Sequence, residues 1–165
     1  MISELENHNR SLVDEHIRKA WAGPFIVSRG VVHDSATLPG FIATNHGRHA
    51  GAVLYHIHDK ECEIVVLYAL SMRQGIGTAL VNAVVKFATQ AGCKRVWLVT
   101  TNDNKRAMEF YRRYGFSLKQ VHYGACRAAR ALKPELPEIG EQGICIEDEL
   151  EFELCLAMNT RTKKG

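Results

Sequence analysis

The middle of the chain contains the pattern that most restricts its fold: a strand, a glycine-containing turn, a helix and a second strand. Residues 61–70 are apolar on both faces from Ile64 onward, as in a central strand covered on each side. Apolar residues in 75–91 recur at helical spacing, and Gly92 follows where a helix-terminating glycine belongs. Residues 94–100 form another strand. Such a strand–helix–strand unit is a crossover between parallel strands, which predicts an α/β fold.

Hairpin strands and short helices are expected around this crossover. Turn residues separate short apolar runs before it, which indicates antiparallel strands. Acidic and apolar residues alternate in 149–158, which predicts a last strand at an edge of the sheet. The sequence therefore predicts a mixed, mostly antiparallel sheet. The other expected helices are 11–21, 103–114 and 125–132, and the other expected strands are 25–32, 40–44, 51–58 and 116–123.

The length of 165 residues suits one domain, so we expect residues 1–165 to share a single core. No apolar run approaches the roughly 18 residues of a membrane span, and the first ten residues lack the features of a targeting peptide. The five cysteines are an odd number without a C-x-x-C pair, which argues against a disulfide framework and a zinc ribbon. A cytoplasmic protein without membrane contact is therefore expected.

The net charge of +3 hides two differently charged parts. Residues 1–133 hold 18 Lys and Arg against 10 Asp and Glu, whereas residues 134–165 hold 3 against 8. No dense basic stripe with interleaved aromatic residues is present, so nucleic acid is not an expected partner. The excess of basic residues in 1–133 instead suits the binding of an anion smaller than a nucleic acid. The excess of acidic residues in 134–165 suits the binding of a cation. Glu149, Glu151 and Glu153 alternate along the last strand, which predicts that they share one exposed face.

Met72–Thr78, with the sequence M-R-Q-G-I-G-T, lies between the buried strand and the strong helix. Glycines let a backbone approach a ligand, and amides at a helix N-terminus form an anion site suited to a pyrophosphate. The segment lacks the third glycine of a dinucleotide fingerprint and the Gly-Lys-Ser/Thr of a P-loop. Taken alone, the G-x-G pattern is equally compatible with a tight strand-to-helix turn.

Three runs in order, E-I-V-V-L-Y-A-L, R-Q-G-I-G-T-A-L and T-T-N-D-N-K-R-A-M-E-F-Y-R-R-Y-G-F, resemble the GNAT N-acetyltransferase family. That family combines a central strand, a glycine-rich pyrophosphate loop and an N-x-x-A-x-x-x-Y-x-x-x-G-F helix and turn. The resemblance covers residues 25–123, and 149–158 resembles the closing strand of the family. It implies a mixed sheet with helices on both faces and a cofactor cleft at the parallel crossover. The long segment 124–147 is the expected acceptor lid.

The resemblance implies that acetyl-CoA lies between the strand ending at Leu70 and the strand 96–100. Main-chain groups of the first strand would pair with the pantetheine arm, and amides of the glycine loop would hold the pyrophosphate. Met72 stands where the family usually has Gln or Arg, so pyrophosphate contact by the Arg73 side chain is less secure than contact by the amides. The implied cofactor residues are Leu67, Tyr68, Ala69, Leu70, Arg73, Gln74, Gly75, Ile76, Gly77, Thr78, Asn104, Ala107, Phe110 and Tyr111.

Direct acetyl transfer needs a base for the amine and an acid for the departing thiolate. The resemblance assigns the base to Glu63, at the start of an otherwise apolar strand where desolvation strengthens a carboxylate base. A strand-end carboxylate paired with Arg or Lys is the alternative. Tyr111 matches the acid of the family motif, with packing beside Phe110 as its alternative. No cysteine matches a covalent acetyl-enzyme position.

Two histidine pairs raise the question of a metal. His56 and His58 lie two residues apart on a strand and therefore on one face, but no Cys or carboxylate at suitable spacing completes a metal site. No metal is therefore expected. The sequence predicts an acetyl-CoA-dependent N-acetyltransferase for a small-molecule or peptide amine. The alternative function is a noncatalytic acetyl-CoA-binding sensor or interaction module with the same fold. Two further points stay open: whether the donor carries a larger acyl group, and whether the protein forms a homodimer.

Overall fold

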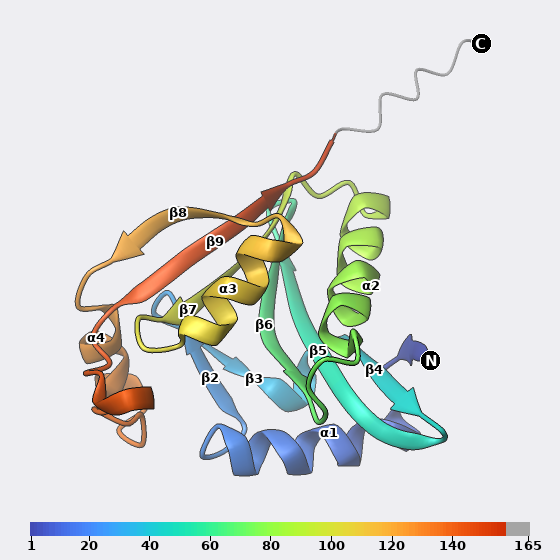
Figure 1. Cartoon of the computed structure of the whole chain (residues 1–165), viewed down its shortest axis with the longest axis horizontal. Helices are drawn as coiled ribbons and strands as arrows, with labels where there is room; N and C mark the ends of the chain where they lie inside the picture. Colours follow the sequence, from blue (N-terminus) through green and yellow to red (C-terminus); the bar gives the residue numbers. More distant parts are fainter. Residues whose placement is uncertain (158–165) are drawn as a thin grey trace.

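Seven strands form one mixed sheet within residues 1–157, the part of the chain that this computed structural model describes (Figure 1). All neighbouring strands in it run antiparallel, apart from one parallel pair at its centre. The mixed, mostly antiparallel sheet predicted from the sequence is confirmed. The order across the sheet is β1 (Ile2–Glu4), β4 (Gly40–Asn45), β5 (Arg48–His58), β6 (Glu61–Ala69), β7 (Arg95–Thr101), β9 (Glu149–Cys155) and β8 (Ser117–His122).

The predicted crossover joins β6 to β7 through α2 (Ile76–Gln90). The two strands pair in parallel only from Glu61–Arg95 to Glu63–Trp97, and beyond these residues their ladder ends. On its other side β6 remains paired with β5, where Val65 is an extra residue that bulges from the ladder. A bulge bends its strand, so β6 turns away from β7 and a gap opens between them.

Helices cover both faces of the sheet, as the sequence predicts (Figure 1). On one face α2 and α3 (Lys105–Tyr114) pack over a core that includes Leu80, Val84 and Phe152. On the other face α1 (Asn7–Ala20) packs over a second core through Val13 and Ile17. Cys62 and Ile64 of β6 belong to the first core, so Glu63 between them points to the face that α1 occupies.

The last strand differs from its prediction. β9 lies between β7 and β8, so the expected edge position of 149–158 is wrong and β8 is the outer strand. Glu149, Glu151 and Glu153 do share one face, but Glu149 and Glu151 are buried, which corrects their expected exposure. Local alternation shows that residues share a face and carries no information about the strands or hairpins that cover it. Met158, the predicted end of the strand, lies outside the described residues.

The segment 25–32 also differs, because it contributes to a hairpin rather than to one strand. β2 (Phe25–Ser28) and β3 (Val31–Asp34) form a small sheet of their own, joined by Arg29 and Gly30, both at positive φ. Glycine adopts this conformation without strain and arginine tolerates it in a turn. The hairpin crosses the α1 face of the large sheet and brings its side chains to Glu63, as described below.

The segment after β8 contains α4 (Ala125–Leu132) and a short 3₁₀ helix (Glu141–Gly143). The buried Lys133 ammonium donates hydrogen bonds to the main-chain oxygens of Trp21 and Phe25, the latter at 2.6 Å. These bonds tie the segment to the connection between α1 and β2. In residues 1–157, no helix is long and apolar enough to cross a membrane.

Candidate active site

A cleft of about 770 Å³ lies between the second half of β6, the following loop and α3. The lining includes thirteen of the fourteen residues predicted to bind the cofactor, and Leu70 lies outside it. Residues separated by more than forty positions therefore meet at one surface. The thirteen are Leu67, Tyr68, Ala69, Arg73, Gln74, Gly75, Ile76, Gly77, Thr78, Asn104, Ala107, Phe110 and Tyr111.

The N-terminus of α2 faces this cleft with unpaired amides. Gly75 is the N-cap residue at a φ of 70°, and the first backbone bond of the helix runs from the Ala79 N–H to the Gly75 oxygen. The amides of residues 76–78 precede this bond and, within residues 1–157, no side chain caps them. At α3, by contrast, Asn104 Oδ1 accepts a hydrogen bond from the Ala107 N–H at 3.1 Å. The α2 amides are therefore the ones available to an anion.

The second glycine of the loop serves the packing of α2 against α3. A Cβ atom at Gly77 would lie 3.3 Å from two ring atoms of Phe110, which is closer than ordinary van der Waals contact. Gly77 therefore lets the two helices that border the cleft approach each other. The two glycines have different tasks: Gly75 adopts a left-handed backbone conformation, whereas Gly77 provides space.

The main chain of β6 forms the opposite wall of the cleft. The Leu70 N–H donates to the Ala50 oxygen at 2.8 Å, so Leu70 directs its main-chain groups toward β5. Main-chain direction alternates along an antiparallel ladder, so Tyr68 also faces β5 while Leu67 and Ala69 face the gap beyond the end of the β6–β7 ladder. Within the described chain, Leu67 and Ala69 are the two predicted β6 residues whose main chains can pair with a ligand.

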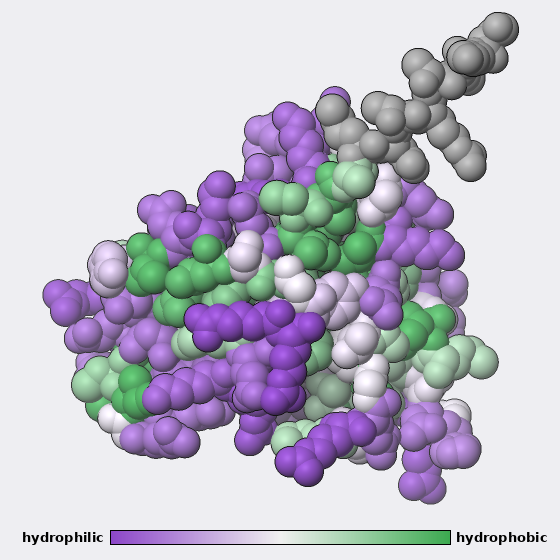
Figure 2. Space-filling view, turned by 45° about the horizontal axis from the view of Figure 1, so that its top comes forward, coloured by the Kyte–Doolittle hydropathy of each residue, from purple (hydrophilic) through white to green (hydrophobic). Residues whose placement is uncertain are grey.

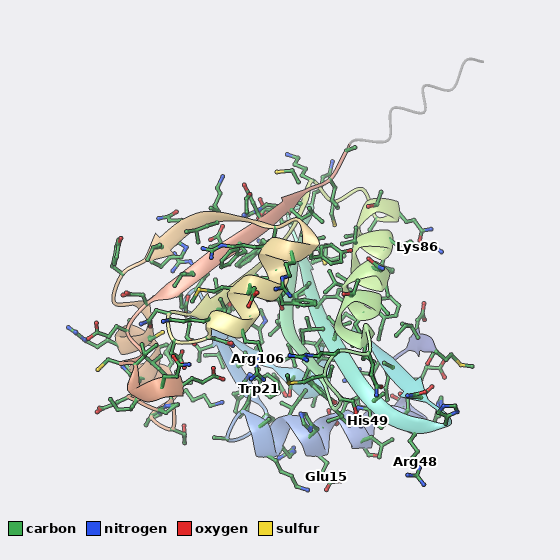
Figure 3. The ribbon with its side chains drawn as sticks, viewed as in Figure 1. Glu15, Trp21, Arg48, His49, Lys86 and Arg106 are labelled. Atoms are coloured by element: carbon green, nitrogen blue, oxygen red, sulfur yellow. The ribbon has the colours of Figure 1, made fainter. Side chains whose placement is uncertain are left out.

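Charged side chains of α3 border the cleft. Arg106 extends from the start of α3 to the loop after β6, where its Nη1 lies 3.1 Å from Met72 Sδ (Figure 3). Arg113 also lines the cleft, whereas the Arg112 guanidinium lies 5.7 Å from the centre of the Phe152 ring. Hydrophilic residues cover α3 in the middle of the face in Figure 2. Arg106 thus places a cation beside the loop position where Met72 supplies none.

Glu63 lies outside the lining of this cleft, at the last residue pair before β6 and β7 separate. Its carboxyl group is buried beneath the β2–β3 hairpin. Ser28 Oγ of β2 donates a hydrogen bond to Glu63 Oε1, and His33 Nε2 of β3 lies 3.4 Å from Glu63 Oε2. The predicted alternative of an Arg or Lys partner does not describe this contact, because the partners of Glu63 are a hydroxyl and an imidazole.

A second buried carboxylate, Glu149, lies beneath the same hairpin. The Arg29 N–H donates to Glu149 Oε2 at 3.2 Å, and Arg29 Nη1 lies 3.9 Å from the same oxygen. Burial is the largest effect on this carboxyl group and raises the pKa of Glu149, and the negative charge of Glu63 acts in the same direction. Arg29 and His122 act against this rise. Sequence alternation placed Glu149 on a polar face but gave no sign of this burial.

Arg95 balances the remaining carboxylates on this face. Its guanidinium lies 3.1 Å from Glu61 Oε2, 2.8 Å from Glu151 Oε2 and 3.0 Å from Glu153 Oε2. Burial would raise the pKa of Glu151, but hydrogen bonds from Arg95 and His122 outweigh it, so that the pKa is lowered. Most of the acidic strand face is therefore neutralised within the protein and does not offer free negative charge to a partner.

Replacing Arg95 by methionine is expected to lower the free energy of unfolding by about 2–3 kcal/mol at pH 7, because charged hydrogen bonds are lost and carboxylates stay behind. Urea denaturation measures this loss. The stabilising effect is present above the ordinary carboxyl pKa and is lost as the pH falls through the lowered pKa of Glu151. Lys19→Met is the control, since its pair with Glu15 is exposed to solvent and contributes little to stability. Equal losses in the two variants would contradict the role of Arg95.

Tyr111 is a buried residue of the cleft lining and packs edge-on against Phe110 and Phe116, with ring centres 5.1 and 5.4 Å from its own. Burial raises the pKa of the Tyr111 hydroxyl well above its ordinary value. The phenol therefore keeps its proton throughout the neutral and mildly alkaline range. A group of this kind can donate a hydrogen bond or a proton and does not compete as an anion.

His56 and His58 of β5 lie on one face of the strand, as predicted. Their rings are nearly parallel, with centres 6.3 Å apart. No group of three or more His, Cys, Asp or Glu side chains in metal-binding arrangement occurs among residues 1–157. His56 instead contacts the His33 ring, with ring centres 5.2 Å apart.

The structure thus brings together a glycine loop, the free amides of the helix that follows it, and a strand that separates from its parallel neighbour. A sequence profile of the acetyltransferase (GNAT) family matches residues 4–116. The chain belongs to this family and is an acetyltransferase.

The chain is also similar to a relative in sequence and to solved structures in fold. The chain is 38% identical to the uncharacterized protein YdhI of Bacillus subtilis over 151 residues, which are 91% of this chain and 92% of that protein. Its fold is similar to the ribosomal-protein-S18-alanine N-acetyltransferase of Escherichia coli, with a TM-score of 0.69, 18% identity and coverage of 98% and 97% of the two chains. A Bacillus subtilis acetyltransferase in complex with CoA gives the same TM-score and identity, with 94% and 98% covered.

Proposed function

We propose that this acetyltransferase moves the acetyl group of acetyl-CoA directly to a primary amine of a small molecule or peptide. The observation that carries the proposal is the meeting of two unpaired main-chain surfaces in one cleft: the α2 amides and the open edge of β6. The first suits a pyrophosphate and the second suits the amides of a pantetheine arm. The complex of a similar structure with CoA supports this choice of ligand.

The residues of the cleft fit acetyl-CoA, which supplies an activated acetyl group as a thioester. The amides of residues 76–78 bind the pyrophosphate, and Arg106 and Arg113 offset its negative charge. Leu67 and Ala69 hold the extended arm through their main-chain groups, and the Leu67 N–H polarises the thioester carbonyl. Of the four residues predicted to pair with the arm, Tyr68 and Leu70 are not assigned to it, because their main chains face β5.

Two side chains move protons in this proposal. Glu63 takes the ammonium proton of the acceptor, through water because its carboxylate is buried at the point where β6 and β7 separate. Tyr111 protonates the sulfur as the C–S bond breaks. The low-polarity site that raises the pKa of Tyr111 also disfavours a free thiolate and so raises the pKa of the departing thiol, which offsets the weaker acidity of the buried phenol.

The remaining parts of the proposal concern the whole chain. We assign residues 1–165 to one catalytic domain and the acceptor side to the region bordered by the segment 124–147. All five cysteines are free thiols, which supports a reducing compartment such as the cytoplasm.

The test is a panel of primary amines with acetyl-CoA, read by release of free thiol, together with CoA titration by calorimetry. We expect CoA binding and amine-dependent thiol release. CoA binding with no thiol release across small amines, polyamines and peptide N-termini would favour the noncatalytic sensor. Absence of CoA binding would contradict both hypotheses, the acetyl-CoA-dependent enzyme and the noncatalytic acetyl-CoA sensor.

A further inference from the structure

The side chain of His33 has an unsatisfied polar atom directed at Glu63. Both side chains are 6% exposed, and His33 Nε2 lies 3.4 Å from Glu63 Oε2. Among the described residues, His33 Nε2 has no hydrogen-bond partner of good geometry. Buried polar atoms are nearly always hydrogen-bonded, so a ring nitrogen this close to a carboxylate oxygen is placed to complete that contact after a small rotation of the imidazole. An imidazole nitrogen can accept a proton from a carboxyl group or donate one to a carboxylate.

The two oxygens of Glu63 have different surroundings. Oε1 accepts the Ser28 hydroxyl, which holds the carboxylate in place, while Oε2 faces the imidazole. Ser28 and His33 come from the paired strands of one hairpin, where Ser28 pairs with Val31 and His33 with Ile26. One small structural unit therefore presents both groups, and Oε2 is the oxygen at which a proton can be exchanged.

We propose that His33 receives the proton that Glu63 takes from the acceptor amine, so that a carboxylate–imidazole pair serves as the base. The proposal rests on the proposed function. An N–H bond of the ammonium breaks as an O–H bond forms on Glu63, and this O–H bond then breaks as an N–H bond forms on His33 Nε2. Glu63 returns to its ionised state for the next turnover, and His33 is a relay that acts through Glu63.

His33 has to release the proton before the next turnover. The half-buried His56 of β5 contacts the His33 ring, with centres 5.2 Å apart, and is the titratable neighbour to which the proton would pass. The other charged groups beneath the hairpin are Arg29, at its turn, and Glu149 of β9, which pair with each other. Glu63 and His56 are therefore the titratable groups that contact His33.

A purely structural role for His33 makes different predictions. Glutamine can still hydrogen-bond to Glu63 but cannot cycle a proton near neutral pH. We expect H33Q to lower kcat about tenfold or more with an unchanged KM for acetyl-CoA, and to change the acid limb of the kcat–pH profile. Added imidazole should restore part of the activity of H33A, because the small base can occupy the space left by the ring.

Two further variants separate the relay from other effects. S28A removes the Oε1 hydrogen bond and should lower kcat without imidazole rescue and with the acid limb retained. H46Q removes an exposed histidine of the β4–β5 turn and should behave as wild type. Wild-type kcat and pH profile in H33Q, or failure of imidazole to rescue a folded H33A, would overturn the relay.

The pair is also testable without turnover. The histidine ring ¹⁵N signals of His33 should change in E63Q, because the group that faces Nε2 changes from a carboxylate to an uncharged amide, and those of His46 should not change. An unchanged His33 signal would overturn the pair even in an active enzyme. If no amine is acetylated, the proposed function fails, and this experiment still decides whether Glu63 and His33 share a proton.

Discussion

Replacing Glu63 by glutamine is expected to lower the turnover number for amine acetylation by about 10²–10⁴-fold, the usual contribution of a general base. Glutamine has the shape of glutamate and can still accept the Ser28 hydroxyl, so the hairpin should stay in place. CoA affinity should be nearly unchanged, because Glu63 lies outside the lining of the cofactor cleft. Steady-state thiol release and CoA calorimetry measure the two quantities separately.

Glu61→Gln is the matched control for this variant. Glu61 lies two residues earlier on the same face of β6, but its carboxylate pairs with Arg95 and it stands before the strands separate. We expect its turnover to remain close to wild type. If E63Q turns over as fast as wild type, Glu63 is not the base. Glu149, the other buried carboxylate beneath the hairpin, is then the next residue to replace.

Replacing Tyr111 by phenylalanine is expected to lower turnover by about 10²–10³-fold without weakening CoA binding. The ring contacts with Phe110 and Phe116 remain, so only the hydroxyl is lost. Because burial raises the pKa of Tyr111, the protonated acid persists as the pH rises. Activity should therefore show no decline between about pH 8 and 10 from ionisation of this residue. A pH–rate profile with saturating amine measures this.

The control for Tyr111 lies on the same helix. Tyr114 donates its hydroxyl to Asn82 Oδ1 at 2.6 Å and lies outside the cleft lining. Tyr114→Phe should keep wild-type turnover. Wild-type turnover in Tyr111→Phe would show that another donor, or water, protonates the sulfur. Equal losses in the two variants would indicate a general effect on α3 rather than an acid.

The crossover and its loop were predictable because the residues that determine them lie close together in the sequence. The helical spacing within 75–91, the apolar strand before it and the glycines between them lie within one short stretch, and the structure confirms all three elements. The cofactor residues followed from the family resemblance, and twelve of them besides Tyr111 line the cleft. Leu70 does not, and its main chain pairs with the end of β5, a contact that the apolar pattern does not reveal.

The surroundings of Glu63 were not predictable, because they depend on contacts between distant segments. No periodicity shows that residues 25–34 leave the large sheet and cross its α1 face, bringing Ser28 and His33 to β6. The same holds for β9, which enters between β7 and β8 and is thereby buried. Alternation indicated which residues of β9 share a face, and only the tertiary arrangement determines what covers them.

The separation of β6 from β7 has a consequence for solubility. A strand with unpaired amide and carbonyl groups is a template on which another chain can add a strand, and exposed edges of this kind promote aggregation. Here the unpaired stretch at Leu67 and Ala69 lies inside a cleft bordered by charged residues of α3, such as Arg106 and Arg113. A small ligand can enter the cleft and reach these peptide groups, whereas a second protein would have to insert a whole strand between two parts of one sheet. The unpaired edge of β6 is therefore accessible to a ligand in the cleft but protected from strand pairing with another copy of the protein.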